Sequence, residues 1–172
     1  MRRILTEHER KTADGLSAPL DEKTARTLAH CMIAILAAAL LHDADHIRQA
    51  INWGYIIPLS VWGVNLTVYV LPAIAIFLIK MRRISAGVVT TIAGLYITVS
   101  FLMLHLLGSF TGAWGVWNNS YPALMKGVMY DGVWFQGVDW ISWVFLIEVP
   151  ILCLPASFIA IRAFMRARRR NL

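Results

Sequence analysis

The chain has 172 residues, of which 58% are hydrophobic and 15% are charged, and it carries a formal net charge of +6. Soluble domains are about half apolar and one-quarter charged, so this composition indicates an integral membrane protein. The basic residues lie in clusters between apolar segments rather than along one surface stripe, which is typical of membrane orientation and excludes a nucleic-acid-binding face.

Four predicted transmembrane helices follow one another along the chain, after a predicted cytoplasmic tail at residues 1–20. We expect these helices at residues 24–53, 58–79, 84–107 and 140–164. Asp21 is a suitable N-cap for the first helix, and Gly54 is a suitable C-terminal stop. We therefore predict an all-α fold in which residues 21–172 form a single four-helix membrane bundle in the lipid bilayer.

The first predicted helix has a short apolar segment. Residues 28–41 are too few to cross the bilayer, which takes about 20 residues, so the helix has to include the polar sequence that follows. Since residues three and four apart share a helix face, four polar side chains are predicted to line one stripe. They are His42, Asp45, His46 and Gln49. Because unpaired charges inside the hydrocarbon cost a few kcal/mol each, we expect this stripe to face the bundle interior.

The two middle helices carry signals for packing and for irregular geometry. Asn65 in the second helix is expected to hydrogen-bond to another helix, and Pro72 is expected to kink the second helix. Gly87 and Gly94 in the third helix are expected to allow close contact with a neighbouring helix, because they have no side chain to hold it away.

Residues 108–139 differ from the membrane segments, because they contain six glycines and many aromatic residues. Tryptophan and tyrosine are favoured at the membrane–water interface, so we predict an extracytoplasmic cap between the third and fourth helices. A short interfacial helix is expected at residues 122–129. The aromatic residues of the predicted cap are Phe110, Trp114, Trp117, Tyr121, Tyr130, Trp134 and Phe135.

The distribution of lysine and arginine predicts the orientation. Fourteen of the 16 basic residues lie near the chain termini or in the turn at residues 80–83, and the other two are Arg48 and Lys126. Because cytoplasmic loops carry the excess of basic residues, both termini are predicted to be cytoplasmic, in the cell (plasma or inner) membrane. The polar stripe and the cap then face the extracytoplasmic side.

The polar groups of different helices are expected at similar depth. With a rise of 1.5 Å per residue, four of them lie about 5 to 12 Å below the outer membrane boundary. They are His42, Asn65, His105 and Glu148. We therefore expect one polar pocket in the outer half of the bilayer, covered by the cap.

This pocket contains a candidate metal site. Histidines four apart on one helix can chelate an ion, and a third histidine with a carboxylate would complete a set that suits zinc, copper or iron. The predicted ligands are His42, Asp45, His46 and His105. One alternative is a b-type haem with His42 and His105 as axial ligands. Another is a structural polar cluster without a ligand, in which Asp43 or Asp45 pairs with Arg48.

Glu148 and Asp45 are candidate catalytic residues, because an ionisable group within a membrane helix is a functional candidate. For Glu148, the structural alternative is a hydrogen bond to a carbonyl that Pro150 leaves free. The first functional hypothesis is a metal or haem protein that performs redox or metal-dependent chemistry on a lipophilic substrate. The second is a non-enzymatic subunit of a homo-oligomer or larger membrane complex, and the third is a transporter in which Glu148 carries protons.

Overall fold

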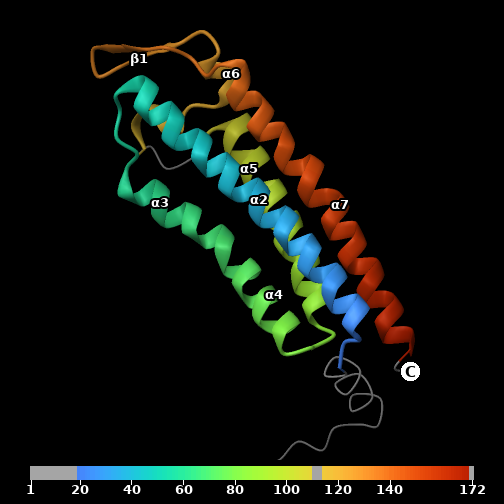
Figure 1. Cartoon of the computed structure of the whole chain (residues 1–172). Coiled ribbons are helices and arrows are strands. Elements are labelled where there is room, and N and C mark those ends of the chain that lie inside the picture. Colours follow the sequence, from blue (N-terminus) through green and yellow to red (C-terminus); the bar gives the residue numbers. More distant parts are fainter. Residues whose placement is uncertain (1–18, 110–113, 171–172) are drawn as a thin grey trace, which may run out of the picture.

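The computed structural model describes residues 19–109 and 114–170, and these residues are mostly helical (Figure 1). Within them, four helical segments are long and apolar enough to cross a membrane. They are α2 (Glu22–Trp53), the segment Leu59–Lys80, α5 (Ala86–Leu107) and α7 (Trp140–Arg170). The predicted number of membrane-length helices is therefore confirmed. Residues 1–18 of the predicted tail at residues 1–20, and Phe110 of the predicted cap, lie outside the described residues.

The helix ends follow local signals in the sequence. The Asp21 side chain accepts a hydrogen bond of 2.8 Å from the backbone N–H of Thr24, and Gly54 ends α2 with a φ of 60°, so both predicted caps are confirmed. α7 continues beyond its predicted end at residue 164. Its last turn carries three arginines, which are good helix formers and favourable at the negative end of the helix dipole.

Helix α7 packs along both α2 and α5, and these three helices form the core of the bundle. Aliphatic side chains at the centre of this core have no exposed surface. They include Leu28, Ile35, Ile97 and Val149. Two glycines let α5 and α7 approach closely, as predicted: a Cβ atom added at Gly87 would lie 2.7 Å from Phe164 Cβ, and one at Gly94 would lie 3.0 Å from the Cys153 carbonyl oxygen.

The second membrane-length segment is divided into three parts. These are α3 (Leu59–Leu66), the 3₁₀ turn η1 (Thr67–Tyr69) and α4 (Val70–Lys80). The turn lies just before Pro72, whose ring has no N–H and clashes with the carbonyl four residues earlier. Helix α4 packs against α5, whereas no residue of α3 is buried. Figure 1 shows the α3–α4 segment on the opposite side of α2 from α7.

The region between α5 and α7 lies over one end of the bundle (Figure 1). It contains the 3₁₀ turn η2 (Gly115–Asn118), the helix α6 (Tyr121–Leu124) and an antiparallel hairpin of β1 (Val128–Tyr130) and β2 (Val133–Phe135). We call this region the cap.

The hairpin differs from the all-α prediction, and the helix expected at residues 122–129 is wrong beyond Leu124. Asp131 and Gly132 connect the two strands with φ values of 54° and 77°. Two successive positive φ angles define the type I′ turn, which favours Asp-Gly and matches the twist of the strands that it joins.

The close contact at Gly94 predicts a measurable loss of stability when a methyl group is added there. A Cβ atom would overlap Ser157 Oγ and lie 3.1 Å from Ile35 Cδ1, so α2, α5 and α7 would all have to adjust. We expect Gly94→Ala to destabilise the bundle by about 1–3 kcal/mol. The thermal unfolding midpoint in detergent measures this. Gly63→Ala is the matched control, because no atom lies within 4 Å of its added Cβ. An equal loss in both variants would contradict this account of the helix contact.

Candidate metal centre

Three histidines meet near the end of the bundle that carries the cap. His42 and His46 lie one turn apart on α2, and His105 lies in the last turn of α5. One ring nitrogen from each lies within 4.8 Å of the others, which is close enough for the group to hold a metal ion. The Nε2 atoms of His42 and His105 are 3.1 Å apart. The predicted convergence of these three side chains is therefore confirmed.

The backbone of α5 fixes the orientation of the His105 ring. His105 Nδ1 lies 2.7 Å from the carbonyl oxygen of Phe101. Because a carbonyl only accepts, Nδ1 has to carry the hydrogen, and this leaves a lone pair on Nε2, which points toward His42. Metal-binding histidines commonly use their second nitrogen in this way, to donate to a backbone carbonyl.

Aromatic side chains surround the histidine group on several sides. Phe101 stacks on His42 with 4.4 Å between ring centroids. Two residues of the cap complete the enclosure: Tyr121 contacts His105 edge-on at 4.7 Å, and Trp117 contacts His46 edge-on at 5.2 Å. The sequence predicted Trp117 and Tyr121 as interfacial residues of a cap over the pocket, without a contact between either residue and a particular histidine. The structure shows that they also cover the histidines, and burial raises the pKa of the Tyr121 hydroxyl.

Asp45 lies outside the histidine group, although the sequence predicted it as a fourth ligand. It is 1% exposed, and its two carboxylate oxygens accept hydrogen bonds of 2.8 Å from Arg48 Nε and Gln49 Nε2. This is the arrangement expected for the structural alternative, in which an aspartate of α2 pairs with Arg48. The predicted catalytic role of Asp45 stays a prediction.

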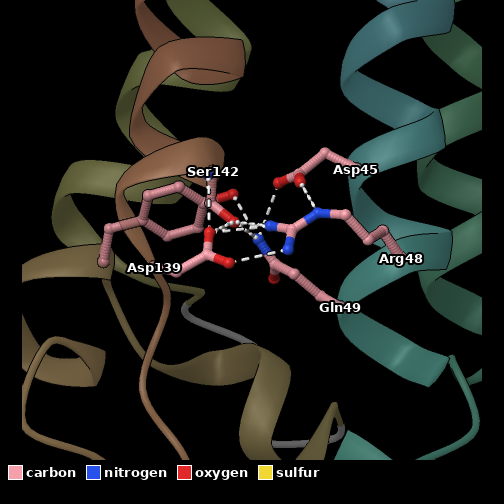
Figure 2. A network of polar contacts seen from close by, with 6 residues as sticks. Asp45, Arg48, Gln49, Asp139 and Ser142 are labelled. Atoms are coloured by element: carbon pink, nitrogen blue, oxygen red, sulfur yellow. Dashed lines mark hydrogen bonds and ion pairs between the residues drawn. The ribbon is translucent and has the colours of Figure 1, made fainter. Parts of the chain in front are cut away.

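Arg48 connects α2 to the start of α7 (Figure 2). Its two Nη atoms donate to the carboxylate of Asp139 at 2.7 and 2.8 Å, and one of them also donates to Ser142 Oγ at 2.9 Å. Asp139 in turn accepts from the backbone N–H of Ser142 at 3.1 Å, as predicted for a helix cap. Gln49 adds hydrogen bonds to Ser142 Oγ at 2.5 Å and to the Tyr121 hydroxyl at 3.1 Å, so the same network also holds the cap.

Asp43 points to the other side of α2 and connects it to the second membrane-length segment. It accepts a hydrogen bond of 2.9 Å from Asn65 Nδ2 and a short one from the Tyr69 hydroxyl. The predicted role of Asn65 as an inter-helix hydrogen-bond donor is therefore confirmed. The sequence alone did not indicate that Tyr69 also donates a hydrogen bond to Asp43.

Glu148 lies partly buried on α7 and does not belong to the metal-capable group that the described residues form. Its predicted roles as a catalytic acid or base, or as a proton carrier, stay predictions.

A cavity of about 410 Å³ reaches the histidine group from the side of α3. His46 and His105 form part of its wall, together with α3, η1, α5 and the cap. Most of the remaining lining is apolar or aromatic, so the centre lies at the inner end of a largely apolar space.

Comparisons of the sequence with known protein families and with curated proteins, and of the structure with solved structures, find no match.

The Arg48–Asp139 pair predicts a specific dependence of stability on pH. Hydrogen bonds from Arg48 lower the pKa of Asp139 in the folded protein. A carboxyl group with a lowered pKa stabilises the fold above its unfolded pKa of about 4, and this contribution is lost as the pH falls through the lowered value. Because the Asp139 side chain is 42% exposed, we expect Asp139→Asn to cost no more than about 1 kcal/mol at pH 7.

Thermal unfolding at pH 7 and at pH 3 tests this prediction. The difference in unfolding midpoint between the parent protein and Asp139→Asn should be smaller at pH 3 than at pH 7, because the parent carboxyl group begins to protonate at the lower pH. Asp131→Asn, at the exposed hairpin turn, is the control and should change stability little at either pH. An Asp139→Asn deficit of equal size at both pH values would show that the ion pair is not its cause.

Proposed function

We propose that this protein is a membrane protein that holds a transition-metal ion on His42, His46 and His105 and uses it for redox or metal-dependent chemistry on a lipophilic molecule. The observation that carries the proposal is the approach of three imidazole nitrogens to within 4.8 Å of one another inside a bundle of membrane-length helices.

The distance between two of the nitrogens and the donor types of all three residues fit a metal ion. Two nitrogens that bind one tetrahedral zinc ion at 2.0–2.1 Å lie about 3.3 Å apart, close to the 3.1 Å between the Nε2 atoms of His42 and His105. Imidazole ligands suit zinc, copper and iron. Three protein ligands leave a fourth position for water or substrate, as in catalytic zinc sites.

An unsatisfied nitrogen atom also supports a bound ion. Nδ1 of His46 is buried and has no hydrogen-bond partner among the described residues. Buried polar groups in folded proteins are nearly always satisfied, so a cluster of histidines with a spare nitrogen is expected where another group binds. Their inward position also avoids the free-energy cost of placing imidazoles in contact with lipid.

The geometry favours a bare ion over the haem alternative. Axial nitrogens on the two faces of a haem iron lie on opposite sides of the macrocycle, about 4 Å apart when each bond is about 2 Å long. The 3.1 Å separation between His42 and His105 leaves no room for a porphyrin ring between them.

The proposed location follows from the charge distribution. Lysine and arginine are concentrated at the chain termini and in the 80–83 turn, which favours cytoplasmic termini. Among the described residues, the basic last turns of α4 and α7 lie at the opposite end of the bundle from the cap (Figure 1), which covers the histidine group. We therefore place the metal centre near the extracytoplasmic side of the cell membrane.

Metal analysis of the purified protein tests the proposal. Protein isolated without chelator should contain one zinc, copper or iron ion per chain. His42→Ala and His105→Ala should each weaken binding at least about 100-fold, because even the loss of a hydrogen-bond partner of a metal ligand costs 10- to 100-fold. Elemental analysis combined with titration of the metal-free protein measures both quantities.

His30→Ala is the matched control, since His30 lies on the same helix with an exposed side chain and outside the group. It should bind metal like the parent protein. Failure of the parent protein to bind any of the three metals stoichiometrically would reject the proposal and favour a purely structural histidine cluster.

A further inference from the structure

We propose that the cavity between α3 and α5 binds a neutral single-chain lipid with a hydroxyl head group, which enters sideways from the bilayer and places its head group beside the histidines. This inference rests on the proposed function in one respect: the lipid is taken to be the molecule on which the metal acts. Binding of the lipid itself requires no metal.

The first observation is the position of the cavity. Its wall on one side is formed by apolar residues of α3, including Val61, Trp62 and Val64. The opposite wall belongs to α5 and includes Val99 and Met103. No residue of α3 is buried, and this helix leaves a space beside α5. After the 3₁₀ turn η1, the chain continues as α4, which packs directly against α5.

The second observation is the direction in which the cavity opens. Val64, Val99 and Met103 line the cavity and are exposed side chains of membrane-length helices, Val99 by 59%. In a membrane this surface contacts hydrocarbon rather than water. A ligand that passes between α3 and α5 therefore comes from the lipid phase.

The third observation is a pair of unsatisfied polar atoms among the lining residues. Trp117 Nε1 is a buried donor without an acceptor, and Gln49 Oε1 is a buried acceptor without a donor. The assignment of the Gln49 amide is supported by Asp45, because only its NH₂ group can donate to that carboxylate. A hydroxyl group both accepts and donates, so it offers the two kinds of hydrogen bond that Trp117 Nε1 and Gln49 Oε1 lack.

The lining also disfavours a charged head group in the metal-free protein. Among the described residues that line the cavity there is no Asp, Glu, Lys or Arg. Without a bound metal ion, a phosphate or carboxylate would be buried there without a counter-ion, at a high cost in free energy. A volume of about 410 Å³ lies within the range of small-molecule sites and suits one chain rather than a two-chain phospholipid.

Photolabelling tests the proposal in lipid nanodiscs that contain the full chain. The probe is hexadecanol that carries a diazirine and an alkyne, and labelled peptides are identified by mass spectrometry. We expect labels at residues 61–68 and 99–105, with competition by unmodified hexadecanol. Labelling spread evenly over the lipid-facing surfaces of all four membrane-length segments would overturn the proposal.

A matched pair of variants tests the entrance. Val99→Trp places a large ring at the mouth of the cavity and should reduce labelling at least about fivefold. Val144→Trp is the control, because Val144 is 52% exposed on α7 and does not line the cavity. Thermal unfolding checks that both variants fold, and Val99→Phe replaces Val99→Trp if the larger ring prevents folding. Equal labelling of the Val99 and Val144 variants would overturn the sideways route.

The head group is tested with Trp117→Phe, which keeps an aromatic ring and removes the N–H donor. Labelling by the alcohol probe should fall about fivefold, as expected for the loss of one hydrogen bond. A second probe is the same molecule with hydrogen in place of the hydroxyl group, and its labelling should be equal in Trp117→Phe and in the parent protein. An equal effect on both probes, or no effect on either, would overturn the hydroxyl assignment.

The same experiment separates this inference from the metal proposal. Metal-free and metal-loaded protein should both show the predicted labelling pattern. If the protein binds no metal and the pattern persists, the metal proposal fails and the lipid site stands. If metal binds at the histidines and the pattern is missing, the lipid site fails and the metal proposal stands.

Discussion

Polar side chains inside a bundle of membrane-length helices need partners, and the structure around the site depends on how α2 meets this constraint. Asp45 faces α7 and accepts hydrogen bonds from Arg48 and Gln49. Asp43 faces the second membrane-length segment and accepts from Asn65. Each aspartate therefore connects α2 to a different part of the molecule, directly or through Arg48. Together they fix the rotation of α2 about its axis.

That rotation decides where the histidines point. His42 and His46 occupy the remaining inward positions of the same turns of α2, and both meet His105 of α5. The neighbouring carboxylates are already occupied by hydrogen bonds from Arg48, Gln49 and other donors. The histidine nitrogens are left as the spare ligand atoms of the site. This division gives the aspartates the structural role and the histidines the capacity to bind a metal.

Much of this arrangement could be predicted from the sequence, because it depends on helix geometry. The short apolar segment of the first helix and the three- and four-residue spacing placed His42 and His46 on an inward face, and the rise per residue placed His105 at the same depth. The pairing of Asp45 with Arg48 was one of the predicted alternatives, because the two residues lie three apart on α2. The contacts of Arg48 with Asp139 and of Gln49 with Tyr121 could not be predicted in this way, because these partners lie 91 and 72 residues further along the chain.

The cap shows a different limit. Its composition predicted an aromatic covering, but glycine-rich segments do not show a helical or strand period, so its path could not be derived. The Asp131-Gly132 pair between two short apolar runs, residues 128–130 and 133–135, was the one strong local signal, and it marks the hairpin that the structure contains. The contacts of Trp117 and Tyr121 with the histidines depend on that path, and sequence spacing carries no information about them.

The central claim is that three imidazoles bind one metal ion. X-ray absorption fine structure at the zinc edge of the zinc-loaded protein tests it most directly, because the method identifies the ligand atoms and their distances. The account predicts three imidazole nitrogens at about 2.0–2.1 Å, and one fewer in His105→Ala. A shell made only of oxygen atoms, or the same spectrum in a variant that lacks all three histidines, would contradict it.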